Sequence, residues 1–168
     1  MNKRGTVTDI IYVSLFIFAL ALAGLLILTV SSAVYPQLIN STIGANPTAN
    51  ATMTEARDFS ESKIDYVISG VIMILLLGIL VFAYLSTANL IFTAIYVVLL
   101  IMSGILAGIF QFAWSRITDG ATLAGALAKM PITNFILSNL VMVMVGVGAI
   151  ALILMYIGYN QQGGGYSG

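Results

Sequence analysis

The chain has 168 residues, of which 60% are hydrophobic and 7% are charged, and its formal net charge is zero. Soluble domains carry about 25% charged residues, so this composition, with a mean hydropathy of +1.07, excludes a soluble globular protein and indicates an integral membrane protein. The absence of cysteine and histidine excludes thiol nucleophiles, disulfides, zinc-type sites and imidazole catalysis, and the absence of a basic run argues against nucleic-acid binding. We therefore predict no catalytic residue, no metal and no cofactor.

The first apolar segment, residues 10–34, is long enough to cross about 30 Å of hydrocarbon as a helix. We interpret it as a retained transmembrane helix, and two alternatives stay open. Residues 31–33, Ser-Ser-Ala, have the small side chains of a signal-peptidase site, although the apolar core of a signal peptide usually has only about 7–15 residues. Residues 3–5, Lys-Arg-Gly, stand before a hydrophobic helix and resemble the processing site of archaeal and bacterial prepilins. That resemblance implies a pilin-like subunit, but here further spans follow instead of a soluble head.

Residues 36–63 form the one substantial polar segment of the chain, and we predict a loop there. The segment is rich in Asn, Thr, Ser and Ala, and it cannot bury enough apolar surface to fold alone. Its charged second half is expected to enter the next span as a helix capped by Thr54. Asn40 and Asn50 each begin an Asn-X-Ser/Thr sequence, so both are candidate glycosylation sites.

Residues 66–115 contain no charged side chain, and the rest of the predicted fold is arranged around them. The stretch is too long for one crossing and suits two, because each crossing needs about 20 residues. Ser-Thr-Ala-Asn at 86–89 interrupts the apolar sequence near its middle. We therefore predict a tight central helical hairpin with spans at residues 66–85 and 90–113.

The chain returns to the membrane once more after this hairpin. Apolar side chains recur at helical spacing within residues 115–130, which fits equally a short helix in the membrane interface and ordinary packing onto the spans. Pro131 suits the first turn of a new helix, and residues 132–157 make a fourth span. Residues 158–168 are rich in Gly, Tyr and Gln and are predicted to be disordered. The expected fold is a single all-α membrane domain with four transmembrane helices.

Small residues mark the helix faces at which neighbouring helices can come close together. Gly104 and Gly108 form a GxxxG pattern in the third span, and Gly146 and Gly148 lie in the fourth. Helices in lipid associate through close backbone approach at small residues and through polar contacts. We therefore predict helix packing at these four glycines.

Polar side chains are few in the predicted spans, and the notable ones are Gln111, Asn134, Ser138 and Asn139. They fit two interpretations, which are hydrogen bonds between helices and the lining of a narrow pore. No Asp, Glu, Lys or Arg lies inside a predicted span. This argues against proton-coupled transport, because ionisable residues within the membrane mark proton and ion pathways.

Aromatic residues support these span limits, since Tyr and Trp favour membrane interfaces. Tyr35, Tyr66 and Trp114 are expected together at one interface. Lys3 and Arg4 precede the first helix and favour a multi-pass topology with cytoplasmic N- and C-termini, which we predict. Basic residues in the loops at the opposite interface outnumber them, and this count favours the reverse orientation.

These observations favour a non-enzymatic structural or assembly subunit of a larger membrane complex, of a viral or a secretion or pilus type. The expected partners are the lipid bilayer and either further copies of the chain or other components of a membrane complex, without nucleic acid. The alternative is a small oligomeric pore or holin-like permeabiliser in which Gln111, Asn134 and Asn139 face inward.

Overall fold

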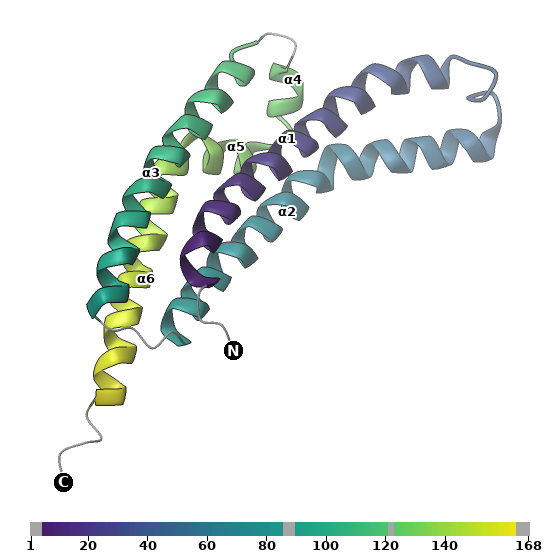
Figure 1. Ribbon diagram of the computed structural model, residues 1–168. Helices are drawn as coiled ribbons and strands as arrows, with labels where there is room; N and C mark the ends of the chain where they lie inside the picture. The colour runs from purple at the N-terminus through teal and green to yellow at the C-terminus, as the bar shows by residue number, and fades with distance from the viewer. Residues whose placement is uncertain (1–4, 86–89, 121–122, 164–168) are drawn as a thin grey trace.

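The computed structural model describes residues 5–85, 90–120 and 123–163, and this part of the chain is helical without strands (Figure 1). Its elements are α1 (Gly5–Ile39), α2 (Pro47–Leu85), α3 (Leu90–Thr118), α4 (Ala124–Leu127), α5 (Pro131–Ser138) and α6 (Leu140–Gly163). The helices α1, α2, α3 and α6 are long and apolar enough to cross a membrane. The predicted all-α fold with four such helices is confirmed.

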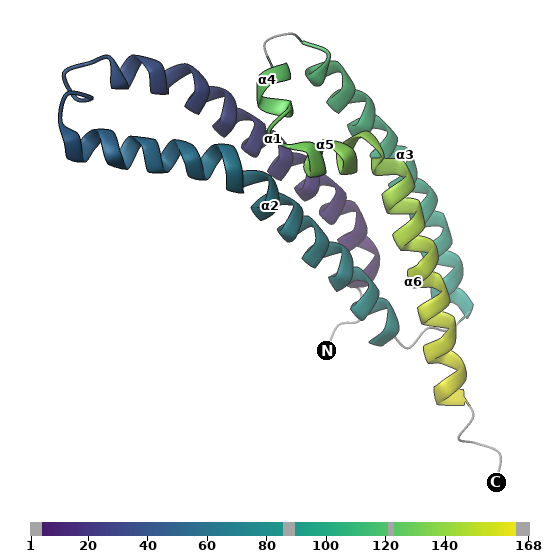
Figure 2. The same ribbon diagram turned by 180° about the vertical axis from the view of Figure 1, so that it is seen from behind.

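The four long helices form a bundle of two layers, with α1 beside α3 in one layer and α2 beside α6 in the other (Figures 1 and 2). The helices within a layer run in the same direction, and the two layers run in opposite directions. Both α1 and α6 pack against α2 and against α3. The helices α2 and α3 are consecutive and run in opposite directions, as predicted for the central hairpin. Each of them packs mainly against α1 and α6 rather than against the other. The predicted turn at 86–89 lies outside the described residues. The helix α1 begins, and α6 ends, at the same end of the bundle.

The structure corrects the predicted polar loop over residues 36–39 and 47–53, which belong to α1 and α2, whereas the helix expected over the charged second half is observed. The helix α1 continues to Ile39 and α2 begins at Pro47, so only residues 40–46 connect them. The segment does not fold alone, which was the basis for predicting a loop. It folds as the distal part of two helices that pack against each other.

Two local contacts explain where α2 begins and how its polar part is held. The side-chain oxygen of Asn46 accepts hydrogen bonds from the N–H groups of Thr48 at 3.0 Å and Ala49 at 3.4 Å, which is the role of an N-cap residue. Thr54, the predicted cap, lies inside α2. Its hydroxyl is 3.2 Å from that of Tyr35 and so joins α2 to α1.

The helices α1 and α2 are longer than one membrane crossing requires. They contain 35 and 39 residues, or about 52 and 58 Å at 1.5 Å per residue, whereas the hydrocarbon layer is about 30 Å thick. Their distal part, residues 31–63, is here called the helical arm. Both views show the arm leaning sideways from the bundle, at the level of α4 and of the C-terminal end of α3 (Figures 1 and 2).

The predicted fourth span, residues 132–157, is divided into two helices. The helix breaks at Asn139, whose φ of −120° and ψ of 25° are not helical. The short helix α5 packs against α1, α2 and α3, and the longer helix α6 crosses the bundle. The helix α6 continues to Gly163, so residues 158–163 are helical rather than disordered, and residues 164–168 lie outside the described part of the chain.

The segment 115–130, predicted in the membrane interface, folds over one end of the bundle. The helix α3 extends into it as far as Thr118, and α4 packs against α1. Ala126 is 8% exposed and Met130 is fully buried. Apolar packing onto the long helices therefore accounts for the helical spacing of these side chains.

The outer surface of the bundle is apolar over much of its area. Ile74 and Phe82 of α2 are 69% and 66% exposed, and Met142 of α6 is 74% exposed. Large apolar side chains at such exposure are unfavourable in water and suited to lipid. Together with the lengths of the four helices, this surface defines an integral membrane protein.

Candidate functional site

The short helix α5 lies at the centre of a group of polar contacts that we call the polar junction, formed by Asp65, Gln111, Trp114, Thr133 and Asn134. Asp65 of α2 is only 4% exposed. One of its carboxylate oxygens accepts hydrogen bonds from the N–H of Thr133 at 2.9 Å and from its hydroxyl at 2.6 Å. The other oxygen accepts the N–H of Ile132 at 2.9 Å.

Asp65 acts as the side-chain N-cap of α5, although it lies on α2, far from α5 in the sequence. The residue before the helix, Met130, makes no side-chain cap, and Pro131 occupies the first turn. The first N–H groups that need an acceptor are therefore those of Ile132 and Thr133. A carboxylate at this end also interacts favourably with the helix dipole. Although Asp65 directly precedes the predicted second span, where water or headgroups could reach a side chain, the carboxylate is buried against α5.

A second contact ties α5 to α3. The indole N–H of Trp114 donates a 2.9 Å hydrogen bond to the side-chain oxygen of Asn134, which also lies 3.4 Å from the Ser138 hydroxyl. Trp114, which was predicted at one membrane interface with Tyr35 and Tyr66, is fully buried and therefore packs inside the protein instead of exposing its ring. Burial is tolerated because the single polar group of the indole has a partner.

A third contact supports the break between α5 and α6. The break leaves the N–H of Val141 without its acceptor within the helix, and the side-chain oxygen of Gln111 on α3 accepts it at 3.1 Å. Asn139 itself is partly exposed, and its side-chain amide donates to the carbonyl of Phe135 at 2.9 Å. Of the four predicted polar residues, Gln111 and Asn134 thus contact another helix, while Ser138 and Asn139 make bonds near to them in the chain.

A charged cluster lies beside the junction, on the helical arm. One carboxylate oxygen of Glu61 accepts hydrogen bonds from Arg57 and from Lys129, both at 2.7 Å. The bond from Arg57 and then that from Lys129 hold the pKa of the Glu61 carboxyl below its usual value. Lys129 precedes α5, so this cluster connects the arm to the segment that covers the end of the bundle. The Arg57 guanidinium also lies 4.5 Å from the centre of the Tyr35 ring.

The four predicted packing glycines lie in different surroundings. A Cβ atom at Gly104 or Gly108 would lie 3.5 or 3.7 Å from a valine of α6, which is ordinary contact, whereas one at Gly146 would meet nothing within 4 Å. A Cβ at Gly148 would lie 2.1 Å from the Leu100 side chain. Of these four glycines, Gly148 is the one whose α-carbon faces a side chain of α3 closely enough to leave no room for a methyl group.

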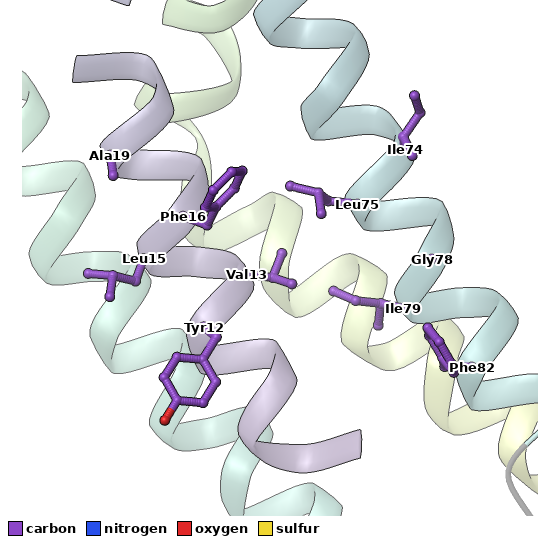
Figure 3. A pocket seen from close by; sticks show the side chains of 10 residues that line it. All are labelled: Tyr12, Val13, Leu15, Phe16, Ala19, Ile74, Leu75, Gly78, Ile79 and Phe82. Atoms are coloured by element: carbon purple, nitrogen blue, oxygen red, sulfur yellow. The ribbon is translucent and has the colours of Figure 1, made fainter. Parts of the chain in front are cut away.

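An apolar groove of about 630 Å³ lies between the membrane-crossing parts of α1 and α2, near the end of the bundle remote from α5 (Figure 3). Phe16 and Leu75 point toward one another across it, as do Val13 and Ile79. All the residues that line it have apolar or aromatic side chains or are glycine. The Tyr12 hydroxyl is the one polar side-chain group among the residues that line it.

The two candidate glycosylation sites lie on the helical arm. Asn40 is exposed just after α1. Asn50 lies in the first turns of α2, where its side-chain amide donates to the Gly44 carbonyl at 3.4 Å and its oxygen lies 3.3 Å from the Thr54 hydroxyl. Asn40 is therefore the more accessible of the two acceptor amides.

The contacts in this part of the molecule are structural in character. Among the described residues, no three His, Cys, Asp or Glu side chains come together as a metal site would require. Comparison with protein-family models, with curated proteins and with solved structures finds no match to this chain. A functional assignment therefore depends on the geometry of the junction, the arm and the apolar surface.

Proposed function

We propose that the protein is a non-enzymatic structural subunit of a larger membrane assembly, of a viral or a secretion or pilus type. The observation that carries the proposal is that polar groups near the membrane bind backbone or side chains of the same molecule. Asp65 binds the start of α5, Gln111 binds the start of α6, and Asn134 binds Trp114. A rigid scaffold uses its polar groups in this way.

The same contacts favour a scaffold over the alternative of a pore. A pore would need Gln111 and Asn134 directed at water, and both hydrogen bond to another helix. Freeing them would leave the Val141 N–H and the Trp114 N–H without acceptors in a site of low polarity, at about 1–3 kcal/mol for each group. The helical arm adds a surface that leans out sideways from the bundle, where neighbouring subunits of an assembly would meet it.

The proposal is tested by isolating the protein in mild detergent from the cells or particles in which it is made. We expect it to elute as part of a complex, with copies of itself or with other membrane proteins. Liposomes that contain it should retain an enclosed dye as well as empty liposomes do. Elution as a lone monomer together with rapid dye release would overturn the proposal in favour of the pore. We also propose cytoplasmic termini, which single cysteines at positions 50 and 165 would test by labelling from opposite sides of the membrane.

A further inference from the structure

A second groove, of about 510 Å³, lies between α1 and α2 and extends from the membrane-crossing part of α1 onto the helical arm. We propose that this groove binds one anionic phospholipid of the surrounding bilayer, with an acyl chain along α1 and the phosphate at Arg57. Its volume is within the range of about 300–1,000 Å³ that is usual for small-molecule sites. The groove is lined by Leu26, Ile27, Val30, Ser31, Val34, Tyr35, Leu38, Met53, Ala56, Arg57 and Ser60.

The apolar part of the groove continues the lipid-facing surface of α1. Leu26, Ile27, Val30 and Val34 are 62%, 52%, 57% and 41% exposed. Leu26 and Ile27 lie four and three residues before Val30, and Val34 lies four residues after it, so all four fall on one face of the helix. The same face carries exposed Leu15 and Phe16 nearer to the middle of the bundle, so an acyl chain in the groove stays continuous with the hydrocarbon layer.

The polar end of the groove suits an anionic headgroup. Arg57 is the only charged residue among those that line it. A guanidinium has five N–H donors in a planar fork that matches phosphate, and Glu61 accepts the Nε–H. Because Lys129 also binds Glu61, the three side chains carry a net charge of +1. Tyr35 holds the guanidinium in place through its ring, at 4.5 Å.

The depth of the groove also fits a phospholipid. Arg57 lies eight residues along α2 from Asp65, or about 12 Å at 1.5 Å per residue. Because the arm leans sideways from the bundle (Figures 1 and 2), its height above Asp65 is smaller than this length. Headgroup layers extend the bilayer from about 30 Å to about 40–45 Å. With Asp65, the residue that precedes the predicted second span, at the edge of the hydrocarbon, the guanidinium lies in the layer of the phosphates.

The proposal is tested by native mass spectrometry of the full chain, released from vesicles of phosphatidylcholine mixed with phosphatidylglycerol. We expect the wild-type protein to retain one phosphatidylglycerol in preference to phosphatidylcholine. Arg57→Gln should lower this preference about five-fold, the factor that corresponds to about 1 kcal/mol for one basic side chain at an anionic surface. Arg116→Gln is the matched control, because Arg116 is exposed and also lies over an aromatic ring, that of Phe112, at 5.0 Å.

A second variant tests the groove independently of the charge. Val30→Trp places a large side chain where the acyl chain would lie, without changing any hydrogen bond of Arg57. It should lower retention of phosphatidylglycerol as Arg57→Gln does, and circular dichroism of each variant reports whether the helices are intact. Equal retention of the two lipids by the wild-type protein, or full retention of phosphatidylglycerol by Arg57→Gln or by Val30→Trp, would overturn the proposal.

Discussion

Replacing Asp65 with alanine removes the acceptor for three donors at the start of α5. The N–H groups of Ile132 and Thr133 and the Thr133 hydroxyl all bind this carboxylate, which is 4% exposed. A buried donor without a partner costs about 1–3 kcal/mol, and loss of an N-cap side chain alone costs about 0.5–2 kcal/mol. The hydroxyl can rotate toward a carbonyl of its own helix, so two N–H groups remain unpaired. We expect Asp65→Ala to lower the free energy of unfolding by about 2–4 kcal/mol.

Asp65→Asn should lie between the wild-type protein and the alanine variant, at about 1–2 kcal/mol, because the amide keeps one acceptor oxygen and loses the other. Asp58→Ala is the matched control, since Asp58 is exposed on the same helix. Denaturant titration in detergent micelles measures the stability, and hydrogen exchange at Ile132 and Thr133 measures the local effect. Equal stability losses for Asp58→Ala and Asp65→Ala, or unchanged exchange at both amides, would refute the reasoning.

Four further predictions follow from individual contacts. Gly148→Ala should destabilise the protein by about 1–3 kcal/mol through overpacking, because the new Cβ would lie 2.1 Å from the Leu100 side chain. Gly146→Ala, where a Cβ meets nothing within 4 Å, should be neutral or stabilising, and thermal unfolding of both variants measures the difference. Trp114→Phe should cost about 1–3 kcal/mol by removing the indole donor, measured by denaturant titration. The buried Ser103 hydroxyl has no partner in the described part of the chain, so Ser103→Ala should not lower the melting temperature. Because the pKa of Glu61 is lowered in the folded protein, the ion pairs of its carboxylate contribute fully to stability above about pH 4.3, the pKa in an unfolded chain. This stabilisation is lost as the pH falls through the folded pKa. Hydrogen exchange in residues 123–130 should therefore rise over that range, and Glu61→Gln should abolish the change.

Much of this fold could be predicted from the sequence because the deciding quantity is local. Whether a segment crosses a membrane depends on the summed hydropathy of about 20 neighbouring residues, and the four long apolar helices follow from that sum. The helical arm could not be predicted in this way. Its sequence is polar, and it is helical because α1 and α2 continue to pack along it, through contacts such as Tyr35–Thr54 and Ser31–Ser60.

The polar junction was missed because its partners are far apart in the chain. Asp65 and Thr133 are separated by 68 residues, and no local pattern links them. One signal was present in the sequence. Met130 precedes Pro131, so the helix that begins there has no Ser, Thr, Asp or Asn at its cap position. A helix start without a local acceptor, next to a membrane, requires an acceptor from another element. Asp65 was the carboxylate directly before the first residue of the predicted second span.

The broken fourth helix explains why this chain keeps polar residues where lipid surrounds it. A continuous helix satisfies its own N–H groups within the membrane, whereas a break creates new donors that lipid cannot accept. The structure meets this demand with Gln111 at the new start of α6, and Asp65 does the same at the start of α5. The break in turn lets α5 turn across the bundle and contact α1, α2 and α3 together. A straight helix could not make these contacts. Asp65 and Gln111 therefore stabilise the broken helix, whose short first part packs against three long helices.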